Sequence, residues 1–160
     1  MFKRILVYLD GSKLAEGIIP YVVEQAKGFN SKVFLLKVNT VSSLIPFYAA
    51  MPGMGTGGLA ANWPLELEEP DTKSYLSNIA RELSDLGLNV ETIVLSGDII
   101  DIVSKFIKDN TIDLIAISSC AYKGWKRILW GNIAQNIIRT CNIPAMVLNP
   151  GRKPLEAIDW

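Results

Sequence analysis

The sequence predicts an α/β protein with an open, doubly wound, five-stranded parallel sheet that carries helices on both faces. Two observations support this prediction. Short apolar runs alternate along the chain with longer amphipathic patterns of helical period. The short runs are almost wholly apolar, which is typical of strands buried on both faces of a parallel sheet. Alternating strands and helices build such a sheet through right-handed crossovers.

The strands are expected where β-branched residues and leucine cluster. The predicted strands are Ile5–Leu9, Val33–Val38, Val90–Leu95, Leu114–Ile117 and, after Pro144, Ala145–Leu148. In folds of this kind, ligands bind beyond the carboxyl ends of the strands, at the point where the strand order reverses. Asp10 directly follows the first predicted strand, so its side chain is expected at this edge.

The first helix is expected to begin at Ser12, because serine is a favourable N-cap residue. Ile18, Val22 and Ala26 then lie on one apolar face. Pro20 interrupts the pattern, and a proline inside a helix costs about 3 kcal/mol. We therefore expect the helix to be kinked, or its first turns to be loosened, near Pro20.

The next two helices are marked by their ends. One is expected from Asp71 to Leu86, because Gly87 is a typical helix terminator. Another is expected from Asp98 to Asp109, with its apolar residues at helical spacing.

The fourth helix is expected from Ile133 to Thr140. Asn132 is a favourable N-cap residue, and Gln135 lies three residues further on, as in a capping box. The free N–H groups of a helix start attract anions, so residues around Gly131 and Asn132 are candidates for holding a phosphate group.

Composition excludes several functions. The chain of 160 residues has no histidine, which excludes a Ser-His-Asp triad, a Cys-His pair and a histidine-based metal site. Cys120 and Cys141 form neither a disulfide framework nor a zinc site, and Cys141 is expected to be a small apolar filler. Sixteen basic residues balance sixteen acidic ones, so general binding to nucleic acid or to an anionic membrane is not expected. No apolar run reaches the roughly 18 residues of a membrane span, and a cytoplasmic protein is expected.

One long segment fits no element. Residues 39–68 contain proline and glycine throughout, yet carry several large apolar residues. We expect part of this loop to pack over a sheet edge or against a partner, because long loops are usually functional or disordered. Gly53–Gly58 has the spacing GxGxxG, but without the preceding strand and following helix that a dinucleotide site needs, so a plain loop is favoured.

Several stretches resemble the universal stress protein family. "RILVYLDGSKLAEGIIPYVVEQAK" is similar to its first strand and helix, "VETIVLSGDIIDIVSKFIKDNTIDLIAIS" to its third strand, third helix and fourth strand, and "CNIPAMVLNP" to its last strand. The resemblance covers nearly all of residues 3–149. It implies the strand order 3-2-1-4-5, one domain over residues 1–150 and a tail over residues 151–160.

The resemblance also implies a nucleotide site, taking ATP or a related nucleotide with or without Mg²⁺. ATP-binding members carry G-x2-G-x9-G-[ST] after the fourth strand, and those positions fall here on Ser118, Ala121, Gly131 and Asn132. Only Gly131 matches strictly, so the loop is degenerate. The residues implied to bind the nucleotide are Leu9, Asp10, Val38, Ile117, Ser118, Ala121, Gly131, Asn132 and Ile133.

Two functions therefore stay open: a nucleotide-binding protein in stress response or signalling, and a dimeric interaction module of the same family that binds no nucleotide. Related nucleotidyl transferases need a histidine-rich signature that this chain lacks. Pyrophosphatase-type synthetases use a Ser-Gly-Gly loop where this chain has Leu9-Asp10-Gly11-Ser12. Any ATP hydrolysis is expected to be slow, since no side chain is an obvious base for activating water.

A homodimer is expected through the last strand. Ala145–Leu148 should lie at the sheet edge, because the chain has no further strand to cover it. An apolar edge strand offers unpaired N–H and C=O groups to a second chain, and the resemblance to the family points to the same pairing.

Overall fold

A computed structural model describes residues 1–39, 72–118 and 126–148, and for residues 126–132 it describes the backbone alone. The expectations for the loop 39–68, for Cys120 and for the tail 151–160 concern residues that lie almost entirely outside this description.

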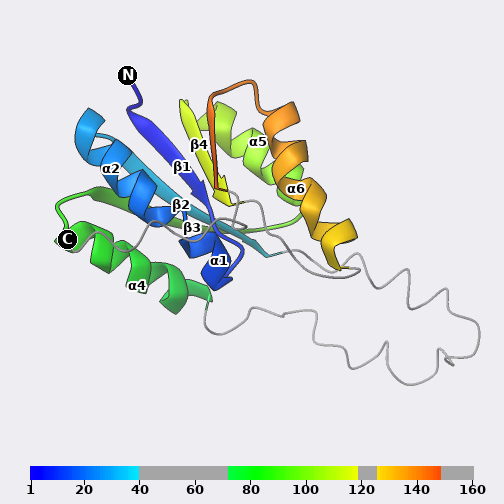
Figure 1. The fold of residues 1–160 in the computed structure, drawn as a ribbon, viewed down its shortest axis with the longest axis horizontal. Coiled ribbons are helices and arrows are strands. Elements are labelled where there is room, and N and C mark those ends of the chain that lie inside the picture. Colours follow the sequence, from blue (N-terminus) through cyan, green and yellow to red (C-terminus); the bar gives the residue numbers. More distant parts are fainter. Residues whose placement is uncertain (40–71, 119–125, 149–160) are drawn as a thin grey trace, which may run out of the picture.

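The five predicted strands form one parallel sheet (Figure 1). Their order is β3-β2-β1-β4-β5, which confirms the expected order. Each strand agrees with its predicted position to within a residue or two. The strands are β1 (Arg4–Tyr8), β2 (Lys32–Asn39), β3 (Asn89–Ser96), β4 (Leu114–Ser118) and β5 (Ala145–Leu148).

Helices cover both faces of the sheet, as expected for a doubly wound fold (Figure 1). On one face a buried cluster joins the sheet to α1 (Lys13–Glu16), α2 (Ile19–Phe29) and α4 (Thr72–Asp85). On the other face a second cluster joins it to α5 (Ile99–Asp109) and α6 (Lys126–Thr140). Residues of β1 alternate between the two clusters, so apolar burial on both sides holds this central strand in place.

The predicted local signals at three helices are confirmed. The Ser12 hydroxyl accepts a hydrogen bond from the Ala15 N–H at 3.1 Å, so Ser12 caps α1. The helix breaks before Pro20, which lies in the first turn of α2, where its missing N–H costs no hydrogen bond. Gly87 follows α4 with φ of +82°, and the Leu88 N–H returns to the Leu83 carbonyl at 3.2 Å, as at a glycine-terminated helix end.

The predicted start of the last helix is wrong. Helix α6 begins at Lys126, so Gly131 and Asn132 lie within the helix and Asn132 is not its N-cap. Residues 126–130 are Lys, Arg, Ile, Leu and Trp, which all tolerate the helix, and an interior glycine costs only about 1 kcal/mol. The unpaired N–H groups of this helix therefore belong to its first turn, beginning at Lys126.

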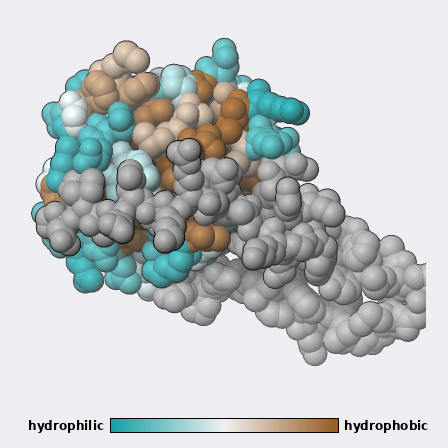
Figure 2. All heavy atoms as spheres, in the orientation of Figure 1, coloured by the Kyte–Doolittle hydropathy of each residue, from teal (hydrophilic) through white to brown (hydrophobic). Residues whose placement is uncertain are grey.

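The two edges of the sheet are β3 and β5. The expectation that the last strand is an edge strand is confirmed. Met146 and Leu148 pack on the cluster that includes α2, whereas the Val147 side chain on the opposite face is 45% exposed. Figure 2 shows hydrophobic residues gathered in the region where Figure 1 draws β5, flanked by hydrophilic surface.

In the described part of the chain, every helix is too short or too polar to cross a membrane.

Candidate functional site

The strand order reverses at β1, which lies between β2 and β4. Tyr8 is in register with Leu36 of β2 and with Ile117 of β4. The Leu9 N–H continues the pairing with β2 by donating to the Leu36 carbonyl at 2.9 Å. The residues that leave β1 therefore pass directly between the carboxyl ends of two neighbouring strands, which is where a ligand site is expected in this fold.

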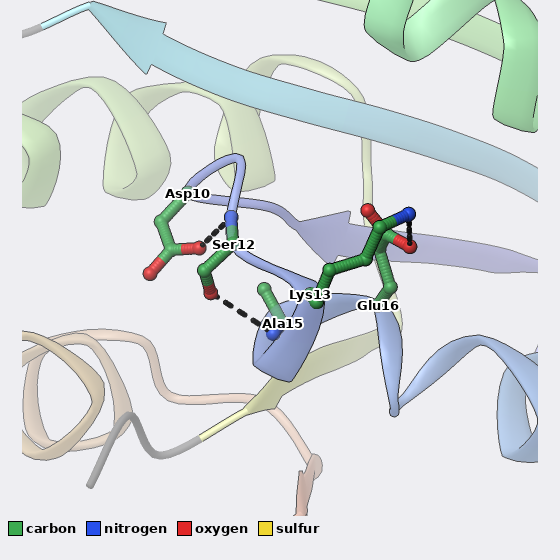
Figure 3. A network of polar contacts seen from close by, with 5 residues as sticks. All are labelled: Asp10, Ser12, Lys13, Ala15 and Glu16. Carbon is green, nitrogen blue, oxygen red and sulfur yellow. Dashed lines mark hydrogen bonds and ion pairs between the residues drawn. The ribbon is translucent and has the colours of Figure 1, made fainter. Parts of the chain in front are cut away.

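A tight local structure follows β1 (Figure 3). The Asp10 carboxylate accepts a hydrogen bond from the Ser12 N–H at 2.8 Å, and Ser12 in turn caps α1. Gly11 between them has φ of +91°, a conformation that favours glycine. Asp10 is thus held in one orientation at the switch point by its own backbone.

An ion pair lies in the short helix α1 that follows this loop. Lys13 Nζ lies 2.8 Å from Glu16 Oε2, within α1 (Figure 3). This contact raises the pKa of Lys13 from its ordinary value through the hydrogen bond and the negative charge of Glu16. Because Lys13 is exposed, the pair contributes little to stability.

The end of β4 is buried beside β1. Ile117 and Ser118 are both almost fully buried, and Ser118 is in register with Leu148 of β5. Val38, near the end of β2, is also buried. The ends of β2 and β4 are therefore both buried on either side of the end of β1.

The structure brings together five of the nine candidate residues. Leu9, Asp10, Val38, Ile117 and Ser118 lie at the carboxyl ends of three adjacent strands.

Of the other four candidates, three lie in α6 and one lies outside the described residues. Ala121 lies outside the described residues, and for Gly131 and Asn132 only the helical backbone is described. Ile133 is partly buried on α6 against the cluster on the α5 side. The nucleotide contacts of all nine residues stay a prediction.

One polar group near the site was missed by the sequence analysis. Lys37 lies in β2 with only 9% of its surface exposed, and its Nζ donates to Thr72 Oγ1 of α4 at 3.3 Å. The same ammonium lies 5.7 Å from the centre of the Tyr75 ring. A signal existed, because Lys37 interrupts the otherwise apolar run of its strand.

The pKa of Tyr75 depends on its burial and on the charges near Lys37. Burial, and then the negative charges of Glu16 and Asp10, raise the pKa of Tyr75 above its ordinary value. Its hydroxyl oxygen is buried and has no hydrogen-bond partner of good geometry among the described residues. Carboxylates from α1 and from the loop after β1 therefore act on the first turn of α4.

Cys141 is remote from the site. It directly follows α6 and is buried in the cluster with α5, where desolvation raises the pKa of its thiol, as expected of an apolar filler. Within the described ranges, no group of three or more His, Cys, Asp or Glu side chains is arranged to hold a metal ion.

These features define a doubly wound α/β protein whose candidate site is an aspartate-bearing loop at the topological switch point. The sequence matches the Universal stress protein family over residues 1–149, and the chain belongs to this family.

Two relatives from Methanocaldococcus jannaschii illustrate the distance within the family. Universal stress protein MJ0531 is 24% identical over 153 residues, covering 96% of this chain and 85% of the relative. Universal stress protein MJ0577 is 27% identical over 154 residues, covering 92% and 95%.

Solved structures share the fold. The structure of MJ0577 superposes with a TM-score of 0.68 at 26% identity, covering 96% of this chain and 98% of that one. A universal stress protein in complex with cAMP gives a TM-score of 0.63 at 14% identity, covering 93% and 98%. One from Archaeoglobus fulgidus in complex with dAMP gives 0.59 at 17% identity, covering 92% and 97%.

Proposed function

We propose that this protein binds ATP or a related adenine nucleotide at the carboxyl ends of β1 and β4 and acts in stress response or signalling. The observation that carries the proposal is the Asp10 carboxylate, which the Ser12 N–H holds in place at the switch point of the sheet. A carboxylate there suits hydrogen-bond donors of a base or ribose. Two proteins of similar fold, described above with cAMP and dAMP, support an adenine nucleotide as the ligand.

The phosphate end of the site is proposed to be weaker than in glycine-rich relatives. Ser118 and Ala121 stand where the family pattern has glycine. Each adds a side chain where a ligand would approach the backbone, and a loss of about 1.4 kcal/mol weakens binding tenfold. A nucleotide with fewer phosphates, held mainly through its base and ribose, is compatible with this arrangement.

The test compares ligand-induced stabilisation of Asp10→Ala and the wild type. A ligand that binds only the folded protein raises stability by RT ln(1 + [L]/Kd). We expect ATP with Mg²⁺, ADP or AMP at millimolar concentration to raise the Tm of the wild type, and the rise to disappear in Asp10→Ala. Asp85→Ala is the matched control, because Asp85 is exposed at the far end of α4.

Two results would refute this proposal. If no adenine nucleotide raises the Tm of the wild type, the protein is not a nucleotide binder of this kind. If the rise persists in Asp10→Ala, the nucleotide binds at another place.

We also infer a homodimer through β5, and the exposed edge favours it. Val147 is 45% exposed, and among the described residues β5 is an edge strand of the sheet. In a two-fold dimer each strand would meet its own copy antiparallel. Light scattering should give a dimer for the wild type and for Val147→Ala, which keeps the N–H, and a monomer for Val147→Pro, which removes it. A monomeric wild type refutes the dimer, and a dimeric Val147→Pro variant places the interface elsewhere.

A further inference from the structure

Lys37 is a buried cation in a strand that is otherwise apolar. Residues alternate across β2, so Leu36 and Val38 face the cluster with α5, whereas Leu35 and Lys37 face α4 and the loop after β1. With 9% of its surface exposed, the lysine keeps little contact with water. Burying an ammonium costs several kcal/mol before its partners compensate, so a buried lysine is weak support for stability by itself.

The ammonium lies directly against the loop that carries Asp10. Lys37 Nζ is 3.1 Å from the position that a Cβ on Gly11 would occupy, and Cε is 3.6 Å from it. On its other side, the same Nζ reaches Thr72 Oγ1 at 3.3 Å and the Tyr75 ring at 5.7 Å. Lys37 therefore bridges the first turn of α4 and the loop after β1.

The charges around Lys37 match a role in holding this loop. The carboxylates of Glu16 and Asp10 both act on Tyr75, whose ring the Lys37 ammonium faces. A positive charge behind a loop that carries a carboxylate attracts that loop toward the sheet, and the attraction is stronger away from bulk water. A methionine or leucine would fill the same space without this attraction.

We propose that Lys37 is a positioning residue for the nucleotide site. Its ammonium, hydrogen-bonded to Thr72, fixes the position of the Gly11 backbone relative to β2. Through Gly11 it also fixes the direction of the Asp10 carboxylate. Lys37 itself lies on the α4 side and does not contact the ligand. The inference rests on the proposed nucleotide site, but the rigidity of the loop after β1 can be measured without any ligand.

The test uses Lys37→Met, which keeps the length and removes the charge. We expect the dissociation constant for ATP, measured by calorimetry, to rise at least fivefold, about the effect of losing one hydrogen bond. Amide hydrogen exchange at Gly11 and Ser12 of the ligand-free protein should become about tenfold faster. The Tm should stay the same or rise, because replacing a buried charge by an apolar side chain is often neutral or stabilising.

Two further variants complete the design. Lys32→Met is the matched control, because Lys32 lies in the same strand at its other end and pairs with Glu91 at 2.7 Å. It should change neither ATP affinity nor exchange at the loop. Thr72→Val removes the anchor of the ammonium and should shift both quantities in the same direction as Lys37→Met, so it replaces that variant if Lys37→Met does not fold.

The outcomes separate this inference from the proposed function. If the wild type binds no nucleotide, the proposed function fails, but faster exchange confined to Gly11 and Ser12 still supports Lys37 as the residue that positions the loop. Unchanged exchange and affinity in Lys37→Met overturn the inference. A lower Tm with faster exchange throughout the sheet also overturns it, because Lys37 would then be a general support of the fold.

Discussion

The chain leaves β1 and β4 at the same edge of the sheet, but the helices that follow begin in different ways. After β1, the Asx-type contact of Asp10, the positive φ of Gly11 and the cap at Ser12 define the start of α1 within three residues. After β4, helix α6 begins at Lys126 and runs through Asn132, a residue equally suited to capping.

The difference shows when a capping residue marks a helix start. Serine or asparagine caps a helix only where the preceding backbone is prevented from being helical. Gly11 provides that break before Ser12 because its φ of +91° is incompatible with a helix. Ahead of Asn132 the residues are helix formers and Gly131, which is a weak barrier. Four predictions test this comparison, from the largest expected effect to the smallest.

Gly11→Ala should cause the largest change. At positive φ an L side chain costs roughly 1–2 kcal/mol, and the new Cβ would also press on Lys37 Nζ. We expect the free energy of unfolding in urea to fall by about that amount. Gly28→Ala is the control with the opposite sign, because Gly28 lies in α2 and a Cβ added there would meet open space. Its free energy of unfolding should rise by up to about 1 kcal/mol. Equal effects of the two variants would contradict the strained turn.

Ser12→Ala should lower the free energy of unfolding by about 1 kcal/mol, the usual cost of losing a side-chain cap. Urea unfolding measures this loss, and Ser12→Asp, which keeps an acceptor, should restore most of it. A neutral Ser12→Ala would mean that the Asp10 contact alone defines the start of α1.

Asn132→Ala should instead raise the free energy of unfolding, by about 0.5 kcal/mol, because alanine is the better residue inside a helix. The sign carries the information, and the same urea experiment provides it. If the variant loses stability as Ser12→Ala does, Asn132 is a cap after all and α6 begins near residue 133.

Tyr75→Phe should have the smallest effect near neutral pH and a visible effect only at high pH. Because the pKa of Tyr75 is raised in the folded protein, its contribution is complete below the unfolded value near 10 and is lost as the pH rises above it. The Tm of the wild type should therefore fall more steeply between pH 9.5 and about 11 than that of Tyr75→Phe. Parallel curves would show that folding does not raise the pKa of Tyr75.

Much of this architecture was predictable because its signals are local. The strand runs, Ser12, the break at Pro20 and the stop at Gly87 each depend on a few neighbouring residues, and all were confirmed. The same holds for Asp10, whose position after the first strand placed it at the switch point.

The α6 start and the Lys37 contacts were not predictable in the same way. Asn132 and Gln135 form a valid local pattern, but a longer helix satisfies the same backbone without a cap there. Lys37 is visible as a charge in an apolar strand, yet its partners Gly11 and Thr72 lie 26 and 35 residues away in the chain. Local periodicity cannot predict a contact between residues that lie so far apart in the chain.

By itself, the sequence determined the order of the elements, the apolar faces and the placement of an aspartate at the end of the first strand. These follow from periodicity and turn chemistry, which act over a few residues. Only the tertiary structure decided which face of β2 receives Lys37 and which loop its ammonium supports. That choice depends on the register between β1 and β2 and on the packing of α4, because a side chain reaches its distant partners only after the sheet has brought them together.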